Sequence, residues 1–416
     1  MLASARLDRQ AEPTRGRPQA GPINTFHDVL LRLTTAGESH GPGLTAIVEG
    51  LPAGLELRPE DIDTDLARRQ LGHGRGGRMK IERDAAEVTA GVRHGRTLGG
   101  PVALQVANRD YANWEERMNP WPVEEKVPEV HLPRPGHADL VGTWKYKQSD
   151  VRNILERASA RETAARVAGG ALAKAFLRAL GVEVRSHVVQ IASVHAPASV
   201  APLTAEDFDA VDESPVRCLD ADSSRAMVAE INALRKANES LGGVFEVQAF
   251  GLTPGLGSHV SWEERLDGRL AMAILSIQAM KGVAIGDGFG VAGVPGSQAH
   301  DEIFYSEEHG YFRETNRSGG LEGGMTTGEP LIVRGAMKPL PTLTKPLRSV
   351  DIATHAPAEA LRERTDSCTV PAAGVVGEAM VALILADAYR QKFGGDHIDD
   401  VREAVRAYEE RIRWRR

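Results

Sequence analysis

The sequence predicts an α+β protein in which antiparallel sheets are each covered on one face by helices. Short runs in both halves of the chain alternate apolar and polar residues, a pattern typical of strands with one buried face. Longer segments with helical spacing of apolar residues separate these runs, above all 160–180 and 370–392. A glycine-rich turn joins the first two alternating runs directly, which favours an antiparallel hairpin at the start of the fold.

That first hairpin consists of the alternating runs 31–35 and 44–48 and the GESHG loop at 37–41 between them. The loop would present Glu38, Ser39 and His40 at the tip of a rigid scaffold, where chemistry is often found. A plain hairpin turn with a polar tip is the alternative interpretation.

Composition narrows the class of protein. The 416 residues carry a net charge of −7, which argues against a general nucleic-acid binder. No run approaches the ~18 apolar residues that span a membrane. Two cysteines, Cys218 and Cys368, are too few for a disulfide framework, so we expect a reducing, cytoplasmic location. Residues 1–28 are rich in Pro, Arg and Gln and lack an apolar period, which predicts a disordered N-terminal extension.

The next element is a helix from Arg58 to Gln70, which begins with a proline and acidic residues. A glycine-rich loop follows at 71–80. Between positions 68 and 96 the chain has eight Lys or Arg residues against three acidic residues. This cationic stretch suits a polyanionic small molecule, whereas a solvated basic loop is the alternative.

Strands are expected at 86–92 and 102–108, followed by the RPGHAD segment at 134–139. Its proline and glycine predict a turn that presents His137, although a lone histidine in a turn is also compatible with a plain surface position. Further on, Ser159 and Glu162 have the spacing of a capping box, so an alanine-rich amphipathic helix should begin at Ser159 and continue to about Leu180. Its free N–H groups, with Arg157 and Arg161 nearby, predict an anion site, and an ordinary capped helix is the alternative.

The second half of the chain shows the same kinds of strand and helix pattern. Strands are expected at 182–191, 244–250 and 330–334, and helical periodicity is strong from Ser224 on. A helix over 266–281 is apolar on nearly all faces, so it should be buried, and Gln278 near its end would then need a polar partner. The loop 318–328 is rich in glycine, but neither GxGxxG order nor a GxxxxGK[ST] motif occurs. A helix from about Val370 to Lys392 and a charged helix over 399–416 complete the chain.

Four segments in order resemble the chorismate synthase family. They are the GESHG loop with 44–52, the RPGHAD segment, the SARET segment at 159–163 with its alanine-rich helix, and the RTD segment at 364–366 with its helix through Glu378. The resemblance covers about 30–395, and the ordered set is highly specific. The first 28 residues have no counterpart in the family core.

The resemblance implies a reaction and a fold. The reaction is the 1,4-anti elimination of phosphate from 5-enolpyruvylshikimate 3-phosphate to give chorismate, the last step of the shikimate pathway. Among FMN, FAD and NADP, the resemblance implies reduced FMN as the cofactor, used without net oxidation or reduction. A separate flavin reductase is expected, with NADPH a possible upstream reductant. The implied fold is a β-α-β sandwich, with helices between two antiparallel sheets, in a single catalytic domain over 29–398 that forms a homotetramer.

The resemblance also implies roles for individual residues. His40 would protonate the departing phosphate, His137 would balance charge on the reduced flavin, and Asp366 would be the acid/base beside flavin N5. The positions implied for the flavin are Arg157, Ala158, Ser159, Gln278, Ala279, Gly323, Lys338, Pro339, Leu340, Pro341, Thr342 and Arg364. Those implied for the substrate are Ser39, Arg78, Arg134 and Arg161. Arg69 and Arg75 match the family's pair assigned to NADP, and whether they contact a pyridine nucleotide or the substrate stays open.

Two other classes of protein stay open at the level of sequence. One is a metal hydrolase using His40, His73, His94 and His137 with Glu38, although no pair has a recognised ligand spacing and we expect no metal. The other is an anion-binding or RNA-binding module built on the basic loop, which predicts steeply salt-dependent binding and no flavin.

Overall fold

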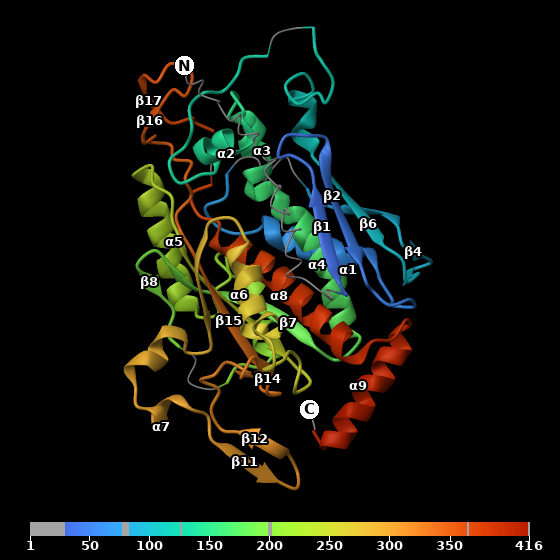
Figure 1. The fold of residues 1–416 in the computed structure, drawn as a ribbon. Coiled ribbons are helices and arrows are strands. Elements are labelled where there is room, and N and C mark those ends of the chain that lie inside the picture. The colour runs from blue at the N-terminus through green and yellow to red at the C-terminus, as the bar shows by residue number, and fades with distance from the viewer. Residues whose placement is uncertain (1–29, 77–82, 125–126, 199–201, 364–365, 415–416) are drawn as a thin grey trace, which may run out of the picture.

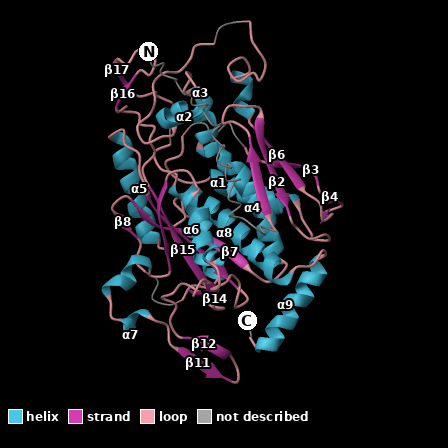
Figure 2. Cartoon of the chain, viewed as in Figure 1, coloured by secondary structure: helices cyan, strands magenta, loops and turns pink. Residues whose placement is uncertain are grey.

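In the computed structural model, two antiparallel sheets lie on either side of a group of helices (Figures 1 and 2), which confirms the α+β class. The structure describes residues 30–76, 83–124, 127–198, 202–363 and 366–414. The first sheet has the order β1-β2-β6-β3. Its strands are β1 (Arg32–Ala36), β2 (Gly43–Glu49), β3 (Ala86–Ala90) and β6 (Val102–Ala107).

The predicted first hairpin is confirmed, since β1 and β2 pair antiparallel with Leu33 opposite Val48. Leu44, Ala46 and Val48 of β2 are buried, and each faces an apolar residue of β6 across the ladder. The period of two in the sequence therefore places one apolar face of the sheet against the helices.

The second sheet has the order β10-β15-β9-β7-β8. Its strands are β7 (Glu183–Ile191), β8 (Val194–His195), β9 (Gly243–Phe250), β10 (Met280–Ile285) and β15 (Leu331–Met337). In β9 the polar residues Glu246 and Gln248 are buried as well as the apolar Phe245 and Val247. Both faces of this central strand are therefore covered, where alternation in the sequence predicts one covered face.

Three helices fill the space between the sheets: α1 (Pro59–Gln70), α4 (Thr163–Arg178) and α8 (Val370–Phe393). Helix α4 contacts β1, β2 and β6 on one side and α8 on the other, and α8 contacts β7, β9 and β15. A Cβ atom at Gly170 of α4 would lie 2.4 Å from Cβ of Ala379 in α8, so this close approach requires glycine. The alanine-rich helix is buried on all sides except at Arg166 and Arg178, not amphipathic as its sequence suggests.

The other elements surround this centre. The helices are α2 (Asp139–Tyr146), α3 (Arg152–Ala158), α5 (Ala221–Lys236), α6 (Leu266–Leu275), α7 (Gly296–Ala299) and α9 (Ile398–Ile412). The 3-10 helices are η2 (Arg109–Asn113), η3 (Ala160–Glu162), η4 (Glu206–Phe208), η5 (Val211–Glu213), η6 (Trp262–Glu264) and η7 (Gly288–Gly293). The short strands are β4 (Val92–Arg93), β5 (Arg96–Thr97), β11 (Ile303–Ser306), β12 (Gly310–Arg313), β13 (Leu321–Glu322), β14 (Met325–Thr326), β16 (Arg348–Val350) and β17 (Pro357–Glu359).

Two sequence predictions about helices are wrong. The helix predicted over 266–281 ends at Leu275, and Met272 and Leu275 are half exposed, because the chain turns there and enters β10. Ser159 and Glu162 form no capping box: the Ser159 hydroxyl accepts from the backbone N–H of Arg161, and a 3-10 turn separates it from α4.

Helix α8 is long and apolar enough to cross a membrane by length and composition, but 89% of its most apolar window is buried inside the protein. Its sequence-predicted end is confirmed, since the helix stops at Gly394, which has φ 62°.

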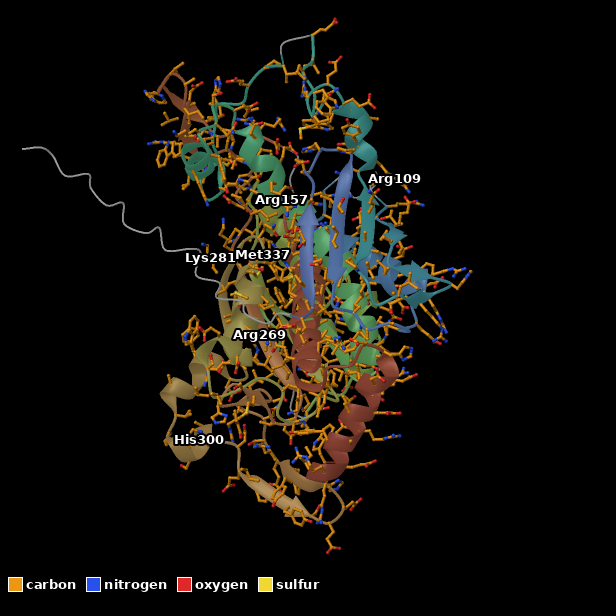
Figure 3. All side chains as sticks on the ribbon, turned by 45° about the vertical axis from the view of Figure 1, so that its right-hand side comes forward. Arg109, Arg157, Arg269, Lys281, His300 and Met337 are labelled. Atoms are coloured by element: carbon orange, nitrogen blue, oxygen red, sulfur yellow. The ribbon has the colours of Figure 1, made fainter. Side chains whose placement is uncertain are left out.

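Both cysteines are buried and unpaired. Figure 3 shows His300, just after α7, toward the lower end of the molecule, well below Arg157 and Arg109.

Candidate active site

A large cavity of about 920 Å³ opens where the ends of many elements meet. Its walls come from the loop after β1, from η2, from the turn before α2, from α3 and η3, and from the segments that flank β10, β15 and α8. The volume lies in the range of ligand sites, which are usually preformed clefts. Loop ends from both sheets and the central helices therefore converge on one place.

His40 lies on one wall of this cavity. Gly37 has φ 112°, and a Cβ there would lie 2.4 Å from the carbonyl oxygen of Gly43, so only glycine closes this loop. The backbone N–H of His40 donates to Oε2 of Glu156 at 2.8 Å, and its Nδ1 lies 2.9 Å from Oε1 of the same carboxylate. The imidazole is thus held at two points by one side chain of α3.

Trp114 packs against the His40 ring, with the ring centroids 4.0 Å apart and 28° between the planes. The guanidinium of Arg152 lies 4.9 Å from the centroid of the same indole and donates to Oε1 of Glu156 at 2.8 Å. Stacking and cation–π contact together fix the indole beside the histidine.

His137 lies on another wall and has a similar support. Its Nδ1 contacts Oδ1 of Asp139, and Arg134 donates to Oδ2 of Asp139 through its backbone N–H and its Nε, at 3.0 and 2.9 Å. Burial alone would raise the pKa of Asp139, but the hydrogen bonds from His137 and Arg134 outweigh it and lower the pKa to about 2. Asp139 therefore stays charged beneath the imidazole.

Asp366 reaches the cavity from the segment before α8. Its Oδ1 accepts from the backbone N–H of Gly76 at 2.5 Å, and its Oδ2 lies 3.4 Å from the guanidinium of Arg75. The carboxylate is thus tied to the glycine-rich loop after α1, which sequence analysis identifies as a cationic segment.

Two buried arginines, Arg69 and Arg161, share the carboxylate of Asp84 behind the cavity wall. Arg161 donates to both oxygens of Asp84 at 2.7 and 2.8 Å, and Arg69 lies 3.3 Å from Oδ2. Arg161 also donates to Asn108, whose amide donates to the carbonyl oxygens of Glu38 and Gly41. The arginine pair is thereby coupled to the loop that holds His40. Burial lowers the pKa of Arg69 to about 9, with Asp84 acting in the opposite direction.

Cations outnumber acids among the described residues that line the cavity. The eight cations are Arg69, Arg75, Arg117, Arg134, Arg152, Arg161, Arg362 and Lys338, and the three acids are Asp110, Glu363 and Asp366. An excess of guanidinium groups in a partly enclosed site favours a ligand with several negative charges.

The lining also leaves a buried hydrogen-bond acceptor for a ligand. Nε2 of Gln278 donates to Glu162 at 3.0 Å, whereas its Oε1 is buried and accepts no hydrogen bond from the part of the chain that the structure describes. A buried acceptor of this kind needs a donor. The next residue, Ala279, has φ 68°, a strained conformation that is often found where backbone meets ligand. The polar partner expected for Gln278 is therefore only half supplied by the protein.

Most residues singled out from the sequence line this one cavity: Ser39, His40, Arg69, Arg75, Arg134, His137, Ala158, Ser159, Arg161, Gln278, Ala279, Lys338, Leu340, Pro341, Thr342 and Asp366. Pro339 lies between two lining residues without being one itself. Arg157 lies outside and donates instead to the Thr35 and Gly37 carbonyl oxygens. Gly323 lies outside in the β13–β14 turn, near His259. Arg78 and Arg364 lie outside the described residues.

Residues that no sequence motif marks support the histidines and close the cavity. Trp114, Arg117, Arg152 and Glu363 line it, and Glu156 lies directly behind His40. Only the spacing of Arg152 and Glu156, four residues apart on one helix, indicates that these two side chains meet. Nothing local in the sequence places either of them beside His40.

Three of the histidines proposed for a metal site each contact a different partner. His40 contacts Glu156, His137 contacts Asp139, and His73 contacts the amide oxygen of Asn232 at 2.9 Å. Within the described residues no group of three or more His, Cys, Asp or Glu side chains is arranged to hold a metal ion.

A cation-rich cavity with two histidines, each backed by a buried carboxylate, defines the class of the protein: an enzyme that acts on a small polyanionic molecule. Comparison with known proteins identifies the family. A family model described as chorismate synthase matches residues 31–389. The chain belongs to the chorismate synthase family. Its members are lyases that remove phosphate from 5-enolpyruvylshikimate 3-phosphate to give chorismate, and this is the reaction of the present chain.

Individual relatives and one solved structure agree with this assignment. A chorismate synthase from Acidothermus cellulolyticus is 56% identical over 387 residues, covering 91% of this chain and 98% of that protein. A chorismate synthase from Moorella thermoacetica is 56% identical over 382 residues, with the same shares of both chains. A crystal structure of chorismate synthase superposes with a TM-score of 0.74 at 43% sequence identity, covering 92% of this chain and 98% of that one.

Proposed function

We propose that phosphate elimination takes place in this cavity, with His40, His137 and Asp366 as its catalytic residues. The observation that carries the proposal is their position: all three line one cavity, although 97 residues separate the first two in sequence and 229 the last two. Each side chain is held by a second charged or polar group, so its orientation is fixed before a ligand enters.

His40 is the proton donor to the departing phosphate in this proposal. A leaving phosphate gains negative charge as its bond to carbon breaks, and a positioned acid or cation stabilises that charge. Ser39 and the arginines Arg69, Arg75, Arg134 and Arg161 bind the two carboxylates and the phosphate of the substrate. Arg78, which lies outside the described residues, belongs to the same glycine-rich loop and completes this set.

A second set of residues, most of them in the cavity lining, would hold reduced FMN. Gln278 offers its buried Oε1 to a donor, Ala279 presents strained backbone, and Lys338 supplies a cation. Ala158, Ser159, Leu340, Pro341 and Thr342 lie on the same walls, and Arg364 belongs to the same segment as Asp366. When bound, the reduced flavin would lend the substrate an electron and recover it, so no net redox change results. His137 would balance negative charge near the flavin, and Asp366 would accept a proton. Pro339, next to Lys338, completes the flavin set, whereas Arg157 and Gly323 would have to act from outside this cavity.

We propose the wider context by the same family relationship. Residues 29–398 form one catalytic domain whose two sheets and central helices are the family's β-α-β sandwich. The predicted disordered extension 1–28 lies outside the described residues, and the predicted charged helix 399–416 corresponds to α9, which ends at Ile412. The enzyme is a cytoplasmic homotetramer that takes its reduced flavin from a separate reductase. NADPH would be the upstream reductant, and Arg69 and Arg75 would then bind the substrate rather than NADP, because both line the substrate cavity.

The test is an anaerobic assay of phosphate release from 5-enolpyruvylshikimate 3-phosphate with photoreduced FMN. We expect His40→Ala and His137→Ala each to lower turnover by about 10²–10⁴-fold while the circular dichroism spectrum stays unchanged. Near-full turnover in either variant would remove that histidine from the mechanism.

A further inference from the structure

Glu156 contacts both the backbone and the ring of His40. Its Oε2 accepts from the backbone N–H of His40 at 2.8 Å, while Oε1 lies 2.9 Å from Nδ1 of the ring. The backbone N–H of Ser39 also donates to the carbonyl oxygen of Glu156 at 3.1 Å. One residue of α3 therefore fixes both the loop and the imidazole it carries.

The carboxylate decides which ring nitrogen carries the proton. An ionised carboxylate only accepts hydrogen bonds, so Nδ1 of His40 must be the donor in this pair. Burial alone would raise the pKa of Glu156, but contacts with His40 and Arg152 outweigh it and lower the pKa below its ordinary value. Glu156 is therefore charged at neutral pH, and Nε2 of His40 is left to exchange the catalytic proton.

The surroundings hold this pair in place. Arg152 donates to Glu156 at 2.8 Å and lies 3.4 Å from Glu363, and the indole of Trp114 packs flat against the imidazole. The charged residues around His40 and its stacked indole come from three places in the chain: Glu38 on the His40 loop, Arg152 and Glu156 on α3, and Asp110 and Arg117, which contact Trp114. Among them, Glu156 contacts the ring directly: Nδ1 of His40 lies 2.9 Å from its Oε1 and 3.1 Å from its Oε2.

We propose that Glu156 is a positioning residue, which holds His40 with a proton on Nδ1 and thereby makes Nε2 the atom that gives its proton to the departing phosphate. When Nε2 releases that proton to a phosphate oxygen, the ring becomes the neutral form with hydrogen on Nδ1, which Glu156 continues to hold. The inference rests on the proposed role of His40 as proton donor and deepens it.

Two variants separate the charge of Glu156 from its shape. Glu156→Gln keeps the length and removes the charge, and we expect kcat to fall by about 10–100-fold while KM changes by less than about 3-fold. Glu156→Asp keeps the charge and should lose less kcat than Glu156→Gln.

A direct measurement does not depend on turnover. The chain is labelled with ¹⁵N in its histidine rings, and the His40 signals are assigned by their absence in His40→Ala. In the unsubstituted protein at high pH, Nδ1 should carry the proton, whereas Glu156→Gln should show a mixture of the two neutral forms. Glu246→Gln is the matched control: this buried glutamate contacts His187 at 3.2 Å in the second sheet, away from the cavity, so its loss should leave kcat and the His40 signals unchanged.

The outcomes distinguish this inference from the proposed function. An unchanged proton position and an unchanged kcat in Glu156→Gln, with His40→Ala inactive, would overturn the role of Glu156 and leave that of His40. Full turnover in His40→Ala would instead overturn the proposed function. If Glu156→Gln does not fold, the unsubstituted protein still decides, because a His40 ring with its proton on Nε2 at high pH contradicts the proposal.

Discussion

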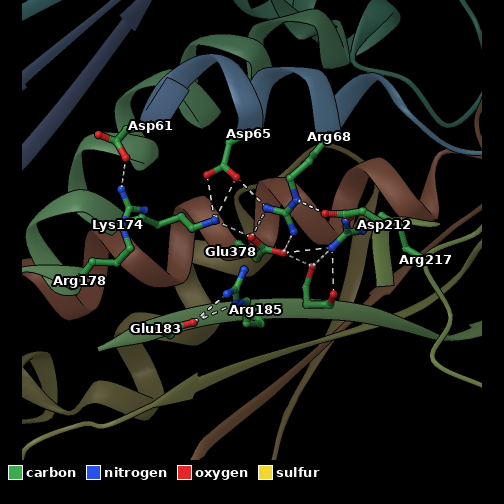
Figure 4. A network of polar contacts seen from close by, with 11 residues as sticks. Asp61, Asp65, Arg68, Lys174, Arg178, Glu183, Arg185, Asp212, Arg217 and Glu378 are labelled. Carbon is green, nitrogen blue, oxygen red and sulfur yellow. Dashed lines mark hydrogen bonds and ion pairs between the residues drawn. The ribbon is translucent and has the colours of Figure 1, made fainter. Parts of the chain in front are cut away.

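Two clusters of charged side chains lie close together in this protein and differ in charge balance. One has equal numbers of cations and carboxylates, and the other has more cations than acids. Between α1, α4, α8 and β7, Arg68, Lys174 and Arg217 surround the carboxylate of Glu378, with Asp65 and Asp212 beside them (Figure 4). Here three cations meet three carboxylates, and the cluster is closed. The cavity cluster has eight cations among its described lining residues against six acids, namely the three lining acids and the buried Asp84, Asp139 and Glu156, so a surplus of positive charge faces the space for a ligand.

Arg68 and Arg69 show how the chain separates the two clusters. They are consecutive in α1, so their side chains leave the helix about 100° apart. Arg68 donates to both oxygens of Glu378 at 2.8 Å, whereas Arg69 lines the cavity and donates to Thr163 at 2.9 Å. Charge balance thus distinguishes a cluster that holds the fold together from one that recognises a ligand, although both use the same residue types.

The largest expected effect is on chemistry in the cavity cluster. Asp366→Asn keeps an acceptor for the N–H of Gly76 but cannot take up a proton, so turnover should fall by about 10²–10⁴-fold while FMN still binds. Turnover is measured by phosphate release and FMN affinity by fluorescence titration. Asp212→Asn is the matched control in the closed cluster and should keep its turnover. Normal turnover in Asp366→Asn would contradict the role of that carboxylate.

The closed cluster should respond in stability instead. Burial alone would raise the pKa of Glu378, but Arg68 and Lys174 outweigh it and hold the pKa well below its ordinary value. Glu378→Gln leaves three buried cations with two carboxylates, so the free energy of unfolding should fall by about 3–5 kcal/mol. Urea denaturation measures this change, and kcat of the folded fraction should be unchanged. An unaltered urea midpoint would show that the cluster does not stabilise the fold.

Arg68 and Arg69 allow the two clusters to be compared by substitutions at neighbouring positions of α1. Arg68→Met should lower the urea midpoint and leave KM unchanged, because it removes the bidentate partner of Glu378. Arg69→Met should raise KM by roughly 10–100-fold, since a hydrogen bond between charged groups contributes about 1.5–3 kcal/mol. Steady-state kinetics and urea denaturation on both variants provide the comparison. Equal changes in KM would mean that the two clusters are not functionally separate.

The smallest effect concerns acid stability at the cavity wall. Because the folded state lowers the pKa of Asp139 to about 2, the charged form is favoured on folding. Its contribution is fully present above about pH 4 and is lost as the pH falls through about 2, and amounts to roughly 1–2 kcal/mol. Asp139→Asn lacks this contribution, so its urea midpoint should lie below that of the unsubstituted protein at pH 5 and approach it toward pH 2. A constant difference at every pH would contradict this linkage.

Sequence patterns predicted strands better than they predicted which helices are buried. Alternation located β1, β2, β6, β7 and β9 to within a residue or two, because each strand buries residues at a period of two. The alanine-rich helix and the apolar stretch after position 266 exchanged their expected environments. The first, α4, lies between two sheets and needs small residues there, while the second ends early because Gln278 and Ala279 turn toward the cavity.

The site was predictable where motif and resemblance marked a residue, and not where support comes from another element. His40, His137 and Asp366 stand in recognisable segments. Glu156, Trp114 and Arg152 do not, because their importance depends on contacts with His40 across a large separation in sequence. A pattern within one stretch of sequence cannot indicate a contact between residues that are so far apart in the chain.

The amino-acid sequence by itself determined strands β1, β2, β6, β7 and β9, the ends of α1 and α8, and which imidazole and carboxylate groups were available for chemistry, since these follow from periodicity, turn residues and side-chain type. Only the tertiary structure decided that Arg68 is enclosed while Arg69 meets a ligand site, and that Glu156 lies behind His40. The physical reason is that charge balance and hydrogen-bond geometry arise from side chains on different elements, and packing alone brings these together.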